Sequence, residues 1–198
     1  MNVFAKAVCA GICISLGCIA FLMSPDKLSG SVLFSVGLMG VVVHKLKLFT
    51  GSVCSIKFKN FDKELLTQGL ILFGNVVGVT IAAWVFFYTG IETDVMTITI
   101  NKLSASWEVV LSKAIFCNIL ICLAVDEWQK QKNSLMVIFA VTVFVLCGFE
   151  HCVANAFYMI ASMGKFYLNF FIVNVIGNAI GGIVFWRLKH MFNEEEEE

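Results

Sequence analysis

The sequence is poor in charge and has almost no proline. Of its 198 residues, 14% are Asp, Glu, Lys or Arg, and one is proline. Soluble domains carry about 25% charged residues, so this chain has too little charge to cover a surface that faces water. Its 14 basic and 14 acidic residues leave no net positive charge, which argues against a nucleic-acid partner.

The chain is rich in apolar residues. Hydrophobic types make up 59% of the chain, and the mean hydropathy is +0.88. This apolar content is ample to offset the entropy of ordering, which excludes a disordered chain. The composition therefore predicts a polytopic membrane protein built from α-helices.

The chain also lacks the usual signatures of catalysis and metal binding. It has no Cys-x-x-Cys pair, Walker loop, Gly-x-Ser-x-Gly, His-Glu-x-x-His or dinucleotide-binding fingerprint. We therefore expect no enzyme activity, no cofactor and no metal site. Its eight cysteines lie in or near apolar runs, so we interpret them as small packing residues and not as a disulfide framework.

Six stretches are long and apolar enough to cross a bilayer, which takes about 20 residues each. They cover roughly 4–24, 31–58, 64–90, 108–128, 135–164 and 166–190. The stretch 97–100 is too short to span. We predict one transmembrane channel domain over 1–193, divided into repeats at 4–90 and 108–190, and a solvated acidic tail at 194–198.

Basic residues set the predicted orientation. Lysine and arginine gather on the cytoplasmic side of membrane proteins. With a cytoplasmic N-terminus, eight basic residues lie inside and three outside. Those inside are Lys6, Lys57, Lys59, Lys63, Lys130, Lys132, Arg187 and Lys189; those outside are Lys27, Lys102 and Lys165. We expect a multi-pass protein of a prokaryotic inner membrane with both termini in the cytoplasm.

The sequence contains an internal repeat. GNVVG at 74–78 resembles GNAIG at 177–181, which lies 103 residues later. At the same offset, the segment 48–52 corresponds to 151–155, while Lys6 and Lys113 open the first and fourth spans at an offset of 107. Because each unit has three spans, the second enters the membrane from the opposite side. The pattern predicts the inverted three-plus-three repeat that many transporters have.

The second and fifth spans are too long and are interrupted at corresponding places. Interrupted helices at matching positions in two halves indicate a permeation site near the midplane. His151 is a candidate proton or hydrogen-bond donor there, with a satisfied structural histidine as the alternative. Glu150 is expected to accept backbone N–H groups in the broken loop, or to pair with Lys47 at the equivalent position of the first repeat.

Two further kinds of polar residue have both a functional and a structural interpretation. Lys113, at the start of the fourth span, either gathers small anions in a vestibule or extends to the membrane surface. Asn75 and Asn178 either line the substrate path or fix helix packing and the broken loops. The candidate pathway residues are His151, Lys113, Thr50, Asn178, Asn75, Leu48, Phe49, Glu150 and Asn155.

Four motifs in order resemble the formate/nitrite transporter family and cover nearly the whole chain. They are LFTG at 48–51, CNILICLAV at 117–125, GFEHCVAN at 148–155 and GNAIGG at 177–182. The resemblance implies an aquaporin-like fold of six spans, a homopentamer with one pore per protomer, and passage of small weak-acid anions such as formate, nitrite or hydrosulfide. It makes His151 the central pore histidine, and it matches Thr50, Lys113 and Asn178 to the loop threonine, the basic residue and the span-six asparagine.

Some positions depart from that family pattern. Lys47 stands where the family usually has Glu, Ser52 replaces Asn, and Asp126 replaces Trp. We expect a membrane channel or transporter in which the anion is protonated near His151 and crosses as a neutral acid. An anion that slides through as an ion, a channel for water or neutral solutes, and a membrane scaffold that does not transport are the alternatives.

Overall fold

The computed structural model describes residues 2–56 and 60–194, so the predicted tail beyond Glu194 and the basic residues Lys57 and Lys59 lie outside it. The described residues form nine α-helices. They are α1 (Val3–Leu22), α2 (Lys27–Val43), α3 (Phe49–Val53), α4 (Phe61–Tyr88), α5 (Val95–Leu103), α6 (Trp107–Gln131), α7 (Ser134–Leu146), α8 (Cys152–Met163) and α9 (Leu168–Glu194).

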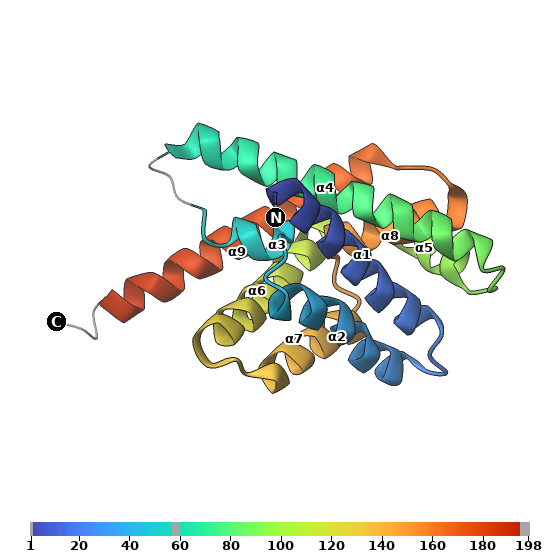
Figure 1. The fold of residues 1–198 in the computed structure, drawn as a ribbon, viewed down its shortest axis with the longest axis horizontal. Coiled ribbons are helices and arrows are strands. Elements are labelled where there is room, and N and C mark those ends of the chain that lie inside the picture. Colours follow the sequence, from blue (N-terminus) through green and yellow to red (C-terminus); the bar gives the residue numbers. More distant parts are fainter. Residues whose placement is uncertain (1, 57–59, 195–198) are drawn as a thin grey trace.

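Four of these helices, α1, α4, α6 and α9, are long and apolar enough to cross a membrane. They pack as two pairs, α1 against α4 and α6 against α9 (Figure 1). Glycines allow this close approach, because a Cβ at Gly78 would clash with the Val8 carbonyl and one at Gly181 with the Ile115 carbonyl. The two helix contacts are therefore copies of one another, as the repeat predicts.

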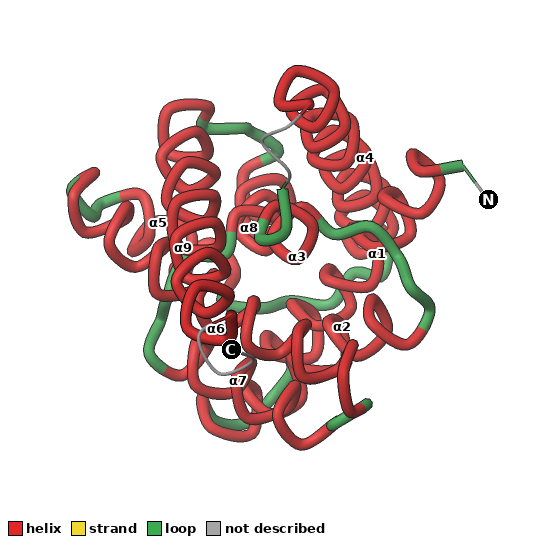
Figure 2. Tube along the Cα trace, turned by 90° about the vertical axis from the view of Figure 1, so that its left-hand side faces the viewer, coloured by secondary structure: helices red, strands yellow, loops and turns green. Residues whose placement is uncertain are grey.

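The second and fifth spans are broken, as predicted. Each consists of two helices, α2 with α3 and α7 with α8, joined by an irregular segment. Figure 2 shows α3 and α8 in the middle of the molecule with the longer helices around them. Together with the two helix pairs, this confirms the all-α inverted repeat with interrupted second and fifth spans.

The same local motif ends the first half of each broken span. After α2, the Leu46 N–H donates to the Val41 carbonyl at 2.9 Å, and Lys45 has a left-handed φ of 52°. After α7, the Phe149 N–H donates to the Phe144 carbonyl at 2.9 Å. Gly148, at φ 67°, stands where Lys45 stands in the first repeat. This is the Schellman ending, in which a left-handed residue turns the chain out of the helix.

The structure adds two details to the sequence prediction. The helix α2 begins at Lys27, four residues before the predicted span, because Asp26 caps it by accepting the Ser29 N–H at 2.9 Å. The Ser29 hydroxyl also donates to this carboxylate and lowers its pKa. The stretch 97–100 belongs to the helix α5, where Thr99 donates its hydroxyl to the Val95 and Tyr158 carbonyls and so fastens α5 to α8.

Candidate functional site

His151 lies at the centre of the fold, with 2% of its surface exposed. It caps the N-terminus of α8, where its Nδ1 accepts the Ala154 backbone N–H at 3.1 Å. An acceptor at Nδ1 places the proton of the neutral ring on Nε2. Nε2 lies 3.0 Å from Thr50 Oγ1, which therefore accepts its hydrogen. The imidazole presents a single N–H to the centre of the molecule, and it stacks on the Phe144 ring.

The start of α3 and the residue before it lie beside this imidazole, which Thr50 contacts. Thr50 is fully buried, while Leu48 and Phe49 are 2% and 5% exposed. The contact between Thr50 and His151 joins α3 of the first repeat to α8 of the second. The two broken spans therefore meet through one polar contact surrounded by apolar side chains.

The predicted pair of Glu150 with Lys47 is wrong. Glu150 is 2% exposed and binds Lys102 on α5, with Nζ and Oε2 separated by 2.6 Å, whereas Lys47 is exposed. Glu150 pairs with Lys102 because α5 packs on α8, and this packing brings the last turn of α5 to the broken loop. Sequence analysis missed this partner, since it considered Lys102 only as one of the basic residues outside the membrane.

Glu150 also organises a buried amide chain. Its Oε2 accepts the Asn155 side-chain N–H at 2.8 Å. The same Asn155 amide donates to Asn174 Oδ1 at 2.8 Å, and Asn174 donates to the Phe170 carbonyl of α9. One carboxylate thus links α5, the broken loop, α8 and α9.

Asn75 holds the broken loop of the first repeat. Its Oδ1 accepts the Phe49 backbone N–H at 2.9 Å. Its amide donates to the Ala7 carbonyl at 2.8 Å and to the Lys47 carbonyl at 2.9 Å. Asn75 is fully buried, so it supplies hydrogen bonds to backbone that the break leaves without helical partners.

Asn178 does the same in the second repeat with equivalent partners. Its Oδ1 accepts the Cys152 N–H at 2.9 Å. Its amide donates to the Ala114 carbonyl at 2.8 Å and the Glu150 carbonyl at 2.9 Å. Asn178 is also fully buried. The structure therefore places both asparagines behind the loops, in the second of the two roles considered above.

One cavity, of about 400 Å³, reaches His151 from the side of α5; we call it the α5 cavity. Three lysines line it, and Glu150 is its only carboxylate among the described residues. The lysines are Lys27, Lys102 and the half-buried Lys113. Because Glu150 is already paired with Lys102, the remaining charge in this cavity is positive.

A second cavity, of about 550 Å³, reaches Leu48 from the side of α3; we call it the α3 cavity. It is lined by Lys45, Lys47 and Lys132, and Glu64 is its only carboxylate among the described residues. The two cavities are separated by the closed contact of α3 with the broken loop of the second repeat. Two positively charged recesses thus lie at the contact between the broken spans, one reaching His151 and the other Leu48.

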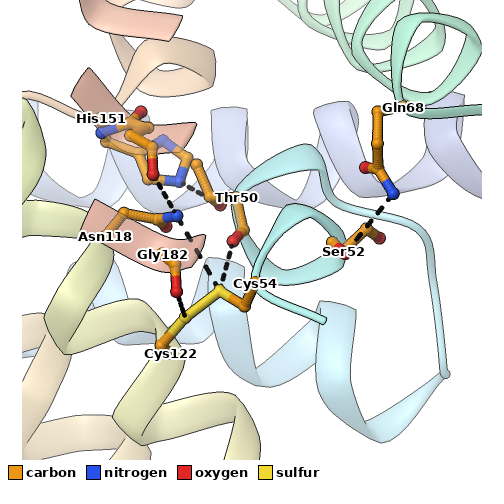
Figure 3. The surroundings of a disulfide bond; sticks show 9 residues. Thr50, Ser52, Cys54, Gln68, Asn118, Cys122, His151 and Gly182 are labelled. Atoms are coloured by element: carbon orange, nitrogen blue, oxygen red, sulfur yellow. Dashed lines mark hydrogen bonds between the residues drawn. A yellow bond between two sulfur atoms is a disulfide. The ribbon is translucent and has the colours of Figure 1, made fainter. Parts of the chain in front are cut away.

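The interpretation of all eight cysteines as packing residues is wrong for two of them. Cys54, just after α3, forms a disulfide with Cys122 on α6 (Figure 3). The two are 68 positions apart in the sequence and are not in a recognisable motif. Only the tertiary packing of α3 against α6 brings them together.

Asp126, a departure from the family pattern, also has a structural role. Its carboxylate is 4% exposed, contacts the Lys189 ammonium of α9, and lies 3.3 Å from Lys130 Nζ. It thereby ties α6 to α9. Within the described ranges, no three His, Cys, Asp or Glu side chains come together as metal ligands.

Comparison with known proteins places this architecture in a family. The model of the formate/nitrite transporter family matches residues 1–192. The chain is 33% identical over 185 residues to the uncharacterized transporter YrhG of Bacillus subtilis, covering 82% of this chain and 70% of that one. It is 27% identical over 181 residues to the formate channel FocA of Haemophilus influenzae, covering 78% and 64% of the two.

Solved structures give the same result. A pentameric formate channel with formate bound superimposes with a TM-score of 0.88 at 25% identity, covering 97% of this chain and 96% of that one. An ion channel of the same family has a TM-score of 0.83 at 22% identity, covering 96% and 89%. The chain therefore belongs to the formate/nitrite transporter family, which confirms the resemblance seen in its motifs.

Proposed function

We propose that this member of the formate/nitrite transporter family conducts small monovalent anions of weak acids, such as formate, nitrite and hydrosulfide, across a membrane. The observation that carries the proposal is the pair of lysine-lined cavities, one of which reaches His151 and the other Leu48, at the contact between the two broken spans. Positive recesses raise the local concentration of anions. The names of the formate channels among its relatives support the same substrate class.

The barrier between the cavities decides the form in which the substrate crosses. Leu48, Phe49 and Phe144 are nearly fully buried around the contact of Thr50 with His151. An ion that enters such a dry region loses its hydration at a large cost in free energy, whereas a neutral acid does not. We infer that the lysines gather the anion, that it takes a proton in the cavity, and that the neutral acid crosses.

The ring of His151 is better suited to donate a hydrogen bond than to supply that proton. Its Nδ1 is occupied by the Ala154 N–H, so protonation there would set two N–H groups against each other. Loss of the Nε2 proton from the neutral ring would leave an imidazolate. We therefore infer that the proton comes from a donor other than His151, and that the Nε2–H guides the acid as it passes Thr50.

We also propose the assembly and location that the family suggests. Exposed large apolar side chains on the long helices, such as Phe73, Trp84 and Phe116, provide surfaces for lipid and for neighbouring protomers. The assembly is a homopentamer in the inner membrane with both termini in the cytoplasm, so the α3 cavity opens to the cytoplasm. Native mass spectrometry tests the number of protomers, which should appear as a complex of five 21.9 kDa chains.

Two substitutions at His151 test the mechanism in proteoliposomes that report formate uptake and internal pH. His151→Asn keeps an N–H donor and should retain at least about a tenth of the flux. His151→Phe removes the donor and should lower flux by about 100-fold or more, since a lost hydrogen bond in a dry site costs about 3 kcal/mol. Protons should enter with formate in the wild type, without net current.

The exposed His44 gives the matched control, because His44→Asn changes a histidine outside the barrier and should leave flux unchanged. A current carried by formate without proton movement would exclude passage of the neutral acid. Equal flux in wild type and His151→Phe would remove the histidine from the mechanism. A folded pentamer that moves no weak acid would overturn the proposed function.

A further inference from the structure

The disulfide between Cys54 and Cys122 joins the two parts of the molecule that meet at the barrier. Cys54 lies four residues after Thr50, and Cys122 lies on α6 of the second repeat. Thr50 is placed between the bridge and His151 (Figure 3). The bridge therefore fixes the C-terminal end of the short helix whose Thr50 closes the path.

Besides the contact of Thr50 with His151 and its packing on α4, α6 and α9, the helix α3 has few hydrogen bonds to other elements among the described residues. It has five residues, which is too short for a helix to be stable by itself. Asn75 holds its N-terminal end through the Phe49 N–H, and the Gln68 amide reaches the Ser52 carbonyl at 3.4 Å. Beyond its C-terminus, Arg187 donates to the Ile56 carbonyl at 3.1 Å. The disulfide is the covalent member of this set.

The surroundings of the bridge fit the reduced form as well. Cys54 Sγ lies 3.1 Å from the Thr50 carbonyl oxygen, and Cys122 Sγ lies 3.6 Å from the Gly182 carbonyl oxygen. Disulfide sulfurs carry no hydrogen, but two thiols would each find an acceptor in place. No described residue donates to the nearby, buried Asn118 Oδ1, so it is a further acceptor beside the bridge.

The α3 cavity provides a route for a small thiol. Ser55, directly after Cys54, lines this cavity, and so does Val125, which lies one turn after Cys122 on α6. In the proposed orientation the cavity opens to the cytoplasm. Disulfides are rare there, and those that form are usually catalytic or redox-sensing. Both sulfurs are nearly fully buried, so exchange requires a local opening of the end of α3.

We propose that Cys54 and Cys122 form a redox-sensitive clamp on α3. The oxidised bridge holds Thr50 against His151 and keeps the barrier closed. A small dithiol opens it: one thiolate attacks a bridge sulfur, the other sulfur leaves as a thiolate and takes a proton, and the second thiol of the reductant resolves the mixed disulfide. The protein gains two thiols, the reductant becomes a cyclic disulfide, and α3 is free to move from the barrier.

Reduction should therefore raise flux, a consequence that rests on the proposed function. The wild type is prepared oxidised with diamide or reduced with dithiothreitol, and mass spectrometry of alkylated protein verifies the state. Formate uptake is expected to rise by about fivefold or more on reduction, which is an ordinary strength of coupling between two states. Cys54→Ser/Cys122→Ser should conduct at the reduced level under both treatments, and Cys147→Ser, at an exposed free cysteine, should respond like the wild type.

Hydrogen exchange over residues 49–56 gives a readout that does not depend on transport. These amides should exchange faster in the reduced wild type and in the double variant than in the oxidised protein. Faster exchange in a protein that moves no weak acid in either state would support the clamp and overturn the proposed function. Equal exchange in the two verified redox states would overturn the clamp, and so would redox-sensitive flux in the double variant.

Discussion

The two repeats share their backbone scaffold and differ in the side chains at its centre. Asn75 and Asn178 make the same three hydrogen bonds, each to partners in equivalent positions. Yet Leu48 of the first repeat corresponds to His151 of the second. The need to satisfy the backbone of a broken helix applies to both halves, so the scaffold residues are the same in each. The chemistry at the centre is needed once, so there the halves have diverged.

Removing the scaffold asparagines should have the largest effect on stability. Asn75→Ala and Asn178→Ala each leave one buried N–H and one loop carbonyl without their partner, and each also removes a bond to a helical carbonyl, that of Ala7 or Ala114. Each unsatisfied group costs about 1–3 kcal/mol, so we expect each variant to lose about 3 kcal/mol or more of unfolding free energy. Thermal unfolding in detergent measures this.

The scaffold comparison predicts similar losses for the two variants. Asn169→Ala, on an exposed position of α9, is the control and should change stability by less than about 0.5 kcal/mol. If one asparagine is essential for folding and the other is dispensable, the two loops are not held in the same way and the comparison fails.

The next largest loss of stability is expected for Glu150→Gln, and not for the same change at Lys47, the counterpart of Glu150 in the first repeat. Glu150→Gln keeps the size of the side chain but leaves the Lys102 ammonium without its counter-charge. Removing one partner of a buried ion pair costs about 3–5 kcal/mol. Lys102 is 18% exposed, which reduces the expected loss to about 2 kcal/mol. Lys47 is exposed, so Lys47→Gln should change stability by less than about 0.5 kcal/mol.

A second change at Lys102 identifies the cause. Lys102→Gln/Glu150→Gln removes both charges and should recover most of the lost stability in the same unfolding assay. A double variant as unstable as the sum of the two single variants would mean that the ion pair is not the source of the loss. Equal losses for Glu150→Gln and Lys47→Gln would show that the halves are also alike in their electrostatics.

The sequence predicted the fold best where the same feature occurs in both repeats. The spans, the two breaks and the matched asparagines each occur twice, and the breaks and asparagines share one offset of 103 residues, so the pattern is hard to mistake for chance. The motifs also marked His151 and Thr50 as candidate pathway residues, and the structure brings their side chains to 3.0 Å.

The features that the sequence did not reveal depend on tertiary placement. Lys102 lies on α5, whose run of β-branched residues gives no strong helix signal and which becomes a helix where it packs on α8. Cys54 and Cys122 are far apart in the chain and resemble the other cysteines in their apolar surroundings. Their pairing follows from the close approach of α3 to α6, where Gly51 packs on Val125.

The smallest changes in unfolding free energy are expected at the left-handed residues that end α2 and α7. A left-handed conformation costs an ordinary L-residue about 1–2 kcal/mol, and glycine avoids this cost. Open space surrounds the position that a Cβ would take at Gly148, so Gly148→Ala should lose about 1 kcal/mol through backbone conformation alone. Lys45→Gly should raise the unfolding free energy by about 0.5 kcal/mol. Glycine removes the strain of the left-handed backbone, but its greater freedom in the unfolded chain offsets part of that gain.

Lys45→Ala separates the backbone from the side chain, since it removes the ammonium but leaves an L-residue at a φ of 52°. It should match the wild type in thermal unfolding, while Lys45→Gly unfolds at a slightly higher temperature. If Gly148→Ala lowers the unfolding free energy and Lys45→Gly raises it, the two turns are the same structural motif, with glycine in one repeat and lysine in the other. A loss of stability in Lys45→Gly would mean that the first turn relies on the lysine side chain, and the equivalence of the repeats would then end at α2.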